Sequence, residues 1–512
     1  MSAEMLWGMA SIVVGLCLAI FGLVPRRSSF LPRKEVGVEL HIHAMDNAKL
    51  TGAHWWLLFV LGVALVIDVM KPATIGFVLP GMRGEYGMTT LQVSLFPFVA
   101  LTGTAIGSLL WGVMADRLGR RATILLAALF FVGTSVCGFM PAFEWNLFMC
   151  FLMGLSAGGM LPIVYALMAE TVPARTRGWL VVLHGGLGTV GGYLVSSGLA
   201  TLFVPIYTWR ILWFFGLPTG LMLILMNRWI PESPRFLLER GDETTAQRVM
   251  SRFGIVVEKR AIKGTRLPDS VLDASNSGNR FVKLFQRPFS LQSLTILLYG
   301  LGWGMVNWGF LTFLPTMLQD AGLQASNASS LLFYASLAAI PGILLVALLY
   351  GKWSSRKTMI TFAALTSVVM ISFAVLSPGF GKLSQPMIVL LGMVLMVSST
   401  AVISMLSPYA AEVYPTHLRG TGSGIAAGSS KLGGMVGPPV MGLLLSSSGT
   451  LMIPILVMGI PIGFAALVLY FSGLETRGRG LEEIQAIATA PMTALPDSVS
   501  RTPLGTGTKK VT

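Results

Sequence analysis

The chain has 512 residues, of which 54% are hydrophobic and only 11% are charged, and its mean hydropathy is +0.74. Soluble domains carry roughly 25% charged residues, so this composition excludes a soluble globular protein and places most side chains in a lipid bilayer. The formal net charge of +14 would suggest a nucleic-acid partner only if the basic residues shared one surface. They lie instead in loops between apolar segments, and we expect no nucleic-acid partner.

The first apolar segment runs from Met5 to Val24 and is followed by Arg26 and Arg27. This pattern predicts an extra membrane helix with its amino terminus outside, followed by a cytoplasmic linker, over residues 1–53. An alternative is that translation begins at Met45.

The apolar segments that follow form two sets of six, each segment close to the roughly 20 residues that cross a bilayer. The first set is Trp55 to Leu79, Leu91 to Met114, Ala122 to Phe139, Asn146 to Met168, Trp179 to Phe203 and Trp209 to Ile230. The second set is Phe289 to Leu314, Ser329 to Tyr350, Met359 to Leu376, Pro386 to Ala410, Gly422 to Leu445 and Leu451 to Phe471.

These segments predict an all-α membrane protein with two six-helix bundles, plus the extra N-terminal helix. The bundles occupy residues 54–230 and 289–472, and a cytoplasmic loop at 231–288 joins them, with an amphipathic pattern around Ala246 to Phe253. A cytoplasmic, largely disordered tail is expected at 473–512, because it is poor in large apolar residues.

The orientation in the membrane follows from the basic residues of the loops. One side carries Arg117, Arg120, Arg121, Arg175, Arg177, Lys352, Arg356, Lys357, Arg419 and the basic stretch from Arg235 to Arg287. The opposite side carries Arg83, Arg210 and Lys382. By the positive-inside rule the first side is cytoplasmic, which predicts a multi-pass protein of the inner (plasma) membrane.

A sequence repeat links the two halves. The string AETVPARTRG ends the fourth segment of the first set, and AEVYPTHLRG ends the fourth segment of the second set. Glu, Pro, Arg and Gly keep the same spacing, so Glu170 and Arg177 correspond to Glu412 and Arg419. A glutamate at a helix end beside an arginine is typical of an interfacial ion pair that ties the helix to its loop.

The loop GVMADRLGRR, from Gly112 to Arg121, is identified as the signature loop of the major facilitator superfamily. The strings PESPR from Pro231 and ETRGRGLEEI from Glu475 resemble those of its sugar-porter and aromatic-acid or metabolite:proton symporter branches. The resemblance spans Trp55 to about Ile484. It implies two six-helix bundles around a central site that opens to each side in turn.

The resemblance also implies a conformational latch at the cytoplasmic side. Asp116 would accept hydrogen bonds from arginines or from a helix amino terminus, in contacts that break during each cycle. A plain positive-inside anchor explains Arg120 and Arg121 equally well. The residues expected in this latch are Asp116, Arg117, Gly119, Arg120, Arg121, Glu170, Arg177, Glu412 and Arg419.

Two opposite charges lie in the first helix of the repeat, where a charge costs at least about 2.5 to 3.5 kcal/mol. Asp68 and Lys71 are three residues apart and are expected to share a helix face. The adjacent Pro72 removes the backbone donor that would bind the Asp68 carbonyl oxygen. This cluster predicts a solute or proton site, and a self-neutralising structural pair is the alternative.

In the families that the chain resembles, an aspartate serves as the proton site at the position of Lys71. Asp68 corresponds to the first aspartate of the aromatic-acid branch's pattern. A lysine suggests an anion-binding group, because its ammonium is a compact point charge. Lys431, in the glycine-rich penultimate helix, is a second intramembrane cation, which either binds the anion too or neutralises Asp68 across the bundles.

Three further residues are candidates for the substrate or proton site. His184 titrates near neutral pH when unperturbed, although a lone histidine in a glycine-rich helix is more often a packing residue. Asn307 and Trp308 offer an amide and an aromatic ring, although tryptophans also populate membrane interfaces without any ligand.

No catalytic site, metal site or cofactor is expected. The string GLGTVG from Gly186 matches a dinucleotide fingerprint but lies inside a membrane helix with no preceding strand. The sequence predicts a secondary carrier, acting as a monomer, for a small organic anion of the aromatic or carboxylic kind, with proton or other ion coupling. The alternatives are a carrier of a sugar or other neutral metabolite, and a transporter-like solute sensor.

Overall fold

The computed structural model describes residues 38–44, 49–261, 277–287, 289–320, 322, 324–378, 384–414 and 416–476. The extra helix expected from Met5 to Val24 and the tail from residue 477 lie outside the described residues. The division of the chain at residues 54, 231, 289 and 473 stays a prediction.

Both predicted sets of six spans are present as helices. The first half comprises α2 (Gly52–Tyr86), α3 (Thr90–Leu118), α4 (Arg120–Gly133) with η2 (Thr134–Phe139), α5 (Phe143–Ala157) with α6 (Met160–Thr171), α7 (Ala174–Tyr207), and α8 (Ile211–Phe214) with α9 (Gly216–Met226) and η3 (Asn227–Trp229). The second half comprises α14 (Ser290–Gly304) with η5 (Met305–Leu311) and α15 (Leu314–Asp320), α16 (Ala325–Lys352), α17 (Ser355–Leu376), α18 (Gln385–Val413), α19 (Thr416–Ser448) and α20 (Met452–Ser472).

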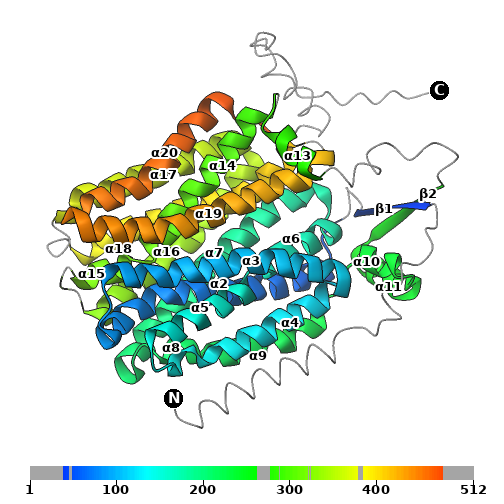
Figure 1. Cartoon of the computed structure of the whole chain (residues 1–512). Coiled ribbons are helices and arrows are strands. Elements are labelled where there is room, and N and C mark those ends of the chain that lie inside the picture. Colours follow the sequence, from blue (N-terminus) through cyan, green and yellow to red (C-terminus); the bar gives the residue numbers. More distant parts are fainter. Residues whose placement is uncertain are drawn as a thin grey trace.

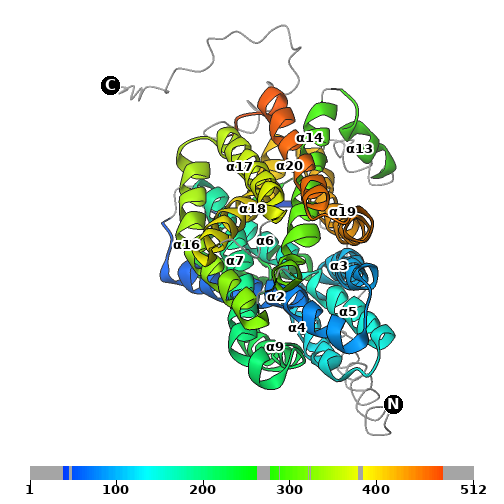
Figure 2. The same cartoon turned by 90° about the vertical axis from the view of Figure 1, so that its left-hand side faces the viewer.

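The two halves form two adjoining bundles whose helices run in the same general direction (Figures 1 and 2). Helix α16 packs along α7, and α19 packs along α3, so each half contributes to both seams between the bundles. We call the end of the bundles beside α10 and α11 the inner end, because the positive-inside rule places it in the cytoplasm. The opposite end is the outer end.

Ten helices of the described residues are long and apolar enough to cross a membrane by themselves. The fourth span of the first half is not among them, because it is split into α5 and α6 at Gly158 and Gly159. The split was not expected from the uninterrupted apolar run. Helix α19 is long enough, but its many glycines and serines lower its hydropathy.

Glycine allows two helices of the first half to touch at the backbone. A Cβ atom on Gly154 of α5 would overlap the carbonyl oxygen of Ala100 in α3. No side chain fits in that space. Such close approach is how small residues hold helices together in lipid, where burial from water contributes nothing.

The connection between the halves carries secondary structure of its own. It contains α10 (Pro234–Glu239), α11 (Glu243–Phe253), β2 (Ile255–Ala261) and α13 (Ser277–Leu284). The predicted amphipathic segment is α11, whose apolar face buries Ala246, Met250 and Phe253. Strand β2 pairs antiparallel with β1 (Val38–Ala44), which precedes the first bundle. The all-α class is confirmed for the bundles, and this small sheet beside them was not expected.

Candidate functional site

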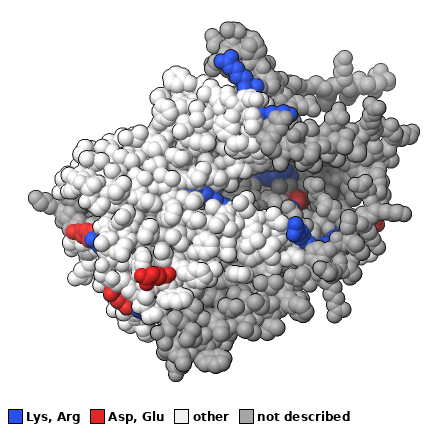
Figure 3. Space-filling view, in the orientation of Figure 1, with Lys and Arg blue, Asp and Glu red and all other residues white. Residues whose placement is uncertain are grey.

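A central cavity of about 180 Å³ lies between the two halves. Its walls come from α2, α3, α6 and α7 of the first half and from α14, η5, α18 and α19 of the second. The polar and aromatic lining residues are Asp68, Thr104, Tyr165, Thr189, Tyr193, Trp303, Asn307, Trp308, Ser404, Ser407, Ser430 and Lys431. Figure 3 shows a hollow with basic and acidic side chains between the halves toward the inner end.

The cavity carries one charge of each sign, one from each half. Asp68 of α2 and Lys431 of α19 both line it, both are half-buried, and they interact electrostatically. Among the residues that the structure describes, neither side chain makes a hydrogen bond or an ion pair within 4 Å. Both alternatives considered for Lys431, anion binding and neutralisation of Asp68, therefore stay predictions, and the structure places the two residues in the wall of one cavity.

The aromatic residues of the wall carry unused polar groups. The Tyr193 hydroxyl and the Trp303 indole N–H are both buried and, within the described part of the chain, lack a hydrogen-bond partner of normal geometry, although the Tyr193 hydroxyl lies near the Asn307 side chain. Buried polar groups are nearly always hydrogen-bonded in folded proteins, so the Trp303 N–H is a donor that the described residues leave unsatisfied, whereas the Tyr193 hydroxyl has the Asn307 side chain as a neighbour.

Asn307 and Trp308 lie on η5, a π-helical segment between α14 and α15. The wider turn interrupts the regular hydrogen-bond ladder of the span and presents both residues to the cavity. Such segments occur frequently at functional sites. The structure thus brings together four of the predicted site residues: Asp68, Asn307, Trp308 and Lys431.

Lys71 lies away from the cavity, contrary to its predicted placement. Its side chain is 1% exposed and enters the interior of the first half, where its ammonium donates to the Phe131 carbonyl oxygen at 2.6 Å and to the Thr134 hydroxyl at 2.5 Å. It also lies 4.1 Å from the centre of the Phe131 ring. Phe131 belongs to the last turn of α4, directly before η2. The expected pairing of Lys71 with Asp68 on one face is not formed.

His184 also lies outside the cavity wall. Its ring nitrogens contact the carbonyl oxygens of Leu180, one turn earlier in α7, at 3.0 Å, and of Leu58 in α2 at 2.8 Å. These contacts join α7 to α2 and match the packing alternative considered for this residue.

At the inner end, the signature loop is bound by a glutamate that sequence reasoning did not select. The Glu232 carboxylate accepts the backbone N–H of Arg120 at 2.7 Å and that of Arg121 at 3.2 Å, so it covers the amino terminus of α4. Gly119 precedes them with φ 94° and ψ 161°, and a Cβ atom there would lie 2.5 Å from a Glu232 oxygen. The signal available in the sequence was the PESPR string itself.

Glu170 forms an ion pair with Arg120 of the signature loop, whereas the sequence pointed to Arg177 as its partner. Arg120 lies 2.5 Å from one Glu170 oxygen, and the Ser233 hydroxyl donates to the other at 2.7 Å. Arg177 donates to the Val172 carbonyl oxygen at 3.0 Å and 3.3 Å. The exposed Arg117 contributes its carbonyl oxygen, which accepts from the Arg240 side chain.

The second half repeats this arrangement with other residues. Glu475 accepts the backbone N–H of Ser355 at 3.0 Å and its hydroxyl at 2.6 Å, at the amino terminus of α17, the counterpart of α4. Glu412 accepts the Tyr350 hydroxyl at 3.2 Å. The side chains of Asp116 and Arg419 lie outside the described residues, so their predicted roles stay predictions.

Comparison with known proteins agrees with this architecture. Residues 52–488 match the family model described as "Sugar (and other) transporter". The niacin transporter NiaP of Acinetobacter baylyi is 25% identical over 86% of this chain and 99% of its own length. From the same organism, a benzoate transport protein is 26% identical over 80% and 87%, and the 4-hydroxybenzoate transporter PcaK is 26% identical over 84% and 93%.

Two solved structures show the same fold. A partially occluded inward-open conformation of the xylose transporter XylE from E. coli has a TM-score of 0.66 and 15% identity, covering 84% of this chain and 100% of that chain. The proton:xylose symporter XylE bound to 6-bromo-6-deoxy-D-glucose has a TM-score of 0.65 and 17% identity, covering 85% and 98%. The chain belongs to the sugar (and other) transporter family of the major facilitator superfamily and is a multi-pass secondary transporter of the inner membrane.

Proposed function

We propose that this transporter carries a monocyclic aromatic carboxylate together with a proton, as a monomeric carrier and not as an enzyme. The observation that carries the proposal is the central cavity, whose wall contains Lys431 together with aromatic side chains. The named substrates of three relatives, niacin, benzoate and 4-hydroxybenzoate, support the same class.

The size of the cavity supports a single ring. Protein cavities of about 150 Å³ bind benzene. The volume of about 180 Å³ leaves room for one ring with a small polar substituent. Trp303, Trp308, Tyr165 and Tyr193 supply the faces and edges on which such a ring packs, in arrangements that aromatic pairs prefer.

The polar groups of the wall suit a carboxylate. In our proposal Lys431 binds the carboxylate as its counter-ion, since an ammonium is a point charge with three donors. The Tyr193 hydroxyl and the Trp303 N–H donate to polar atoms of the solute. The solute would then supply an acceptor to the Trp303 N–H, which the described residues leave without a partner.

In this proposal, Asp68 couples proton binding to solute binding. While Asp68 is ionised, it competes with the solute carboxylate for the positive charge of Lys431. When Asp68 takes up a proton, Lys431 is released for the solute, so proton and anion bind together. The proton site at Asp68 and the solute site at Lys431 are thus coupled. Binding of the proton increases the affinity for the solute, and binding of the solute increases the affinity for the proton by the same factor.

The experiment is uptake of radiolabelled benzoate into proteoliposomes with and without an imposed pH gradient. The wild-type protein should accumulate benzoate only with the gradient. Asp68→Asn should still exchange external for internal benzoate but should lose accumulation driven by the gradient. Accumulation by Asp68→Asn equal to the wild type would refute the assigned coupling role, and Thr104→Val, on the same wall, serves as the matched control.

A further inference from the structure

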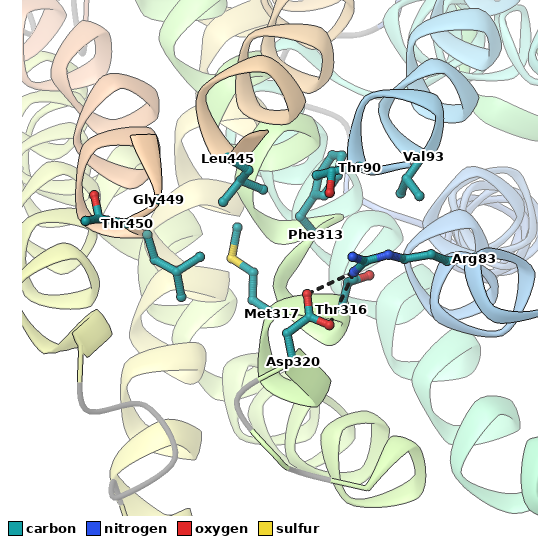
Figure 4. A pocket seen from close by; sticks show the side chains of 11 residues that line it. Arg83, Thr90, Val93, Phe313, Thr316, Met317, Asp320, Leu445, Gly449 and Thr450 are labelled. Carbon is teal, nitrogen blue, oxygen red and sulfur yellow. Dashed lines mark hydrogen bonds and ion pairs between the residues drawn. The ribbon is translucent and has the colours of Figure 1, made fainter. Parts of the chain in front are cut away.

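A second cavity, of about 230 Å³, lies at the outer end of the seam between the halves. Its wall includes Arg83 at the end of α2, Val93 of α3, and Thr316 and Asp320 of α15 (Figure 4). We call it the outer cavity. In the orientation given by the positive-inside rule, it lies on the outer side of the central cavity.

Arg83 and Asp320 join the two halves across the outer cavity. One terminal nitrogen of Arg83 donates to both oxygens of the Asp320 carboxylate, at 3.2 Å and 3.0 Å. The two side chains are 34% and 63% exposed, so the pair is in contact with water. Exposed ion pairs contribute little stability, which allows the pair to break and re-form during each transport cycle.

A buried donor without an acceptor lies in the same wall. Thr316 is 7% exposed, and its hydroxyl has no hydrogen-bond partner among the residues described in the structure. In Figure 4 its side chain lies beside the Arg83 and Asp320 side chains. An arginine and a threonine that line one small cavity are suited to a carboxylate, because both side chains donate hydrogen bonds and neither carries negative charge.

We propose that Arg83 and Thr316 form an outer subsite for the carboxylate of the solute, and that Asp320 occupies this subsite when the outer end is closed. The Asp320 carboxylate thus stands where the carboxylate of an arriving solute binds. An external anion and Asp320 compete for Arg83, so anion binding favours the open outer end. The subsite rests on the proposed function for the class of its ligand.

The Arg83–Asp320 pair, which we call the gate because it would hold the outer end closed, is tested by labelling. Val93 is 1% exposed and lines the outer cavity, so Val93→Cys should react with a membrane-impermeant maleimide only when the outer end opens. All variants in this experiment also carry Cys17→Ser, which removes one native thiol. The other two native cysteines, Cys137 and Cys150, are buried and should not react. Asp320→Asn should raise the labelling rate about two- to fivefold, which corresponds to the loss of one exposed ion pair.

The matched control is Glu85→Gln. Glu85 forms an ion pair with Arg210 near the outer end too, but both residues belong to the first half, so its loss should leave the labelling rate unchanged. Exchanging the partners, by Arg83→Asp with Asp320→Arg, should restore the wild-type rate. Equal rates for Asp320→Asn, Glu85→Gln and the wild type would overturn the gate.

The subsite is tested in full-length protein that carries Val93→Cys together with Lys431→Met, which removes the cation of the central cavity. External benzoate should still accelerate labelling of the introduced thiol in this variant, and the neutral analogue benzamide should not. Adding Arg83→Gln should abolish the benzoate effect. A benzoate effect that is absent with Lys431→Met alone, or that survives Arg83→Gln, would overturn the subsite.

Failure of the proposed function can be distinguished from failure of the gate. If the wild type takes up no benzoate, the proposed function fails, whereas the labelling of the Asp320→Asn variant still tests the gate.

Discussion

Gly119 shows how one backbone conformation constrains the signature loop. Its φ of 94° and ψ of 161° lie in a region that only glycine occupies without strain, and its missing Cβ leaves space for the Glu232 carboxylate. The same loop contains Gly112, a helical residue with open space around its Cβ position. The backbone and the packing of this structure therefore require glycine at position 119 and do not require it at position 112.

Gly119→Ala should destabilise the protein by about 1–3 kcal/mol through backbone strain, and the contact with Glu232 adds to this loss. Gly112→Ala should cause no loss, because alanine is the better helix former. Thermal unfolding of the purified variants distinguishes the two positions. Equal melting temperatures for the two variants would refute the role assigned to the Gly119 backbone.

Lys71 shows where reasoning from the sequence reached its limit at the scale of a residue. The spacing of Asp68 and Lys71 predicted a shared face, but three residues on a helix still leave an angle of about 60° between side chains. At the edge of a cavity, this angle determines whether a side chain points into the cavity or into the neighbouring helices. Asp68 reaches the cavity, and Lys71 reaches the last turn of α4, whose position no local pattern reveals.

At the scale of elements, hydropathy predicted the membrane spans well because a bilayer imposes one length on every span. It did not predict the interruptions. The break between α5 and α6 and the π-helical turn η5 depend on how neighbouring helices pack, and η5 is the element that presents Asn307 and Trp308. The lining of a site is therefore harder to predict than the helix that carries it.

Each half covers the amino terminus of its third span with a glutamate that follows its sixth span. Glu232 does so for α4 and Glu475 for α17. A carboxylate is favourable there because the first backbone N–H groups of a helix lack partners and the helix dipole is positive. These contacts join positions more than a hundred residues apart, so the sequence showed the two strings without showing what they bind.

Glu232→Gln should lower the free energy of unfolding by about 1 kcal/mol, because an amide offers one acceptor where the carboxylate offered two and carries no charge. The control is Glu144→Gln, an exposed glutamate in the first turn of α5. Thermal unfolding should show the larger loss for Glu232→Gln, because Glu232 accepts two backbone N–H groups in addition to its favourable interaction with the helix dipole. The same melting temperature in both variants would contradict the capping role.

At the scale of the whole molecule, the two halves share a scaffold and divide the chemistry. Both carry the Glu, Pro, Arg and Gly repeat at the inner end. The first half supplies Asp68 to the central cavity and the second half supplies Lys431, while Thr189 of the first half lines the cavity at the offset that corresponds to Lys431. Rocking one half against the other, as carriers of inverted or parallel repeats do, would change the distance between the two charges.

The central claim is that Lys431 binds the carboxylate of an aromatic solute, and calorimetric titration of purified protein with benzoate tests it most directly. Lys431→Met should weaken binding roughly ten- to hundredfold, the loss expected for a hydrogen bond to a charged group. Lys71→Met, the other intramembrane lysine, should keep the wild-type affinity. Unchanged affinity in Lys431→Met, or a loss confined to Lys71→Met, would contradict the account.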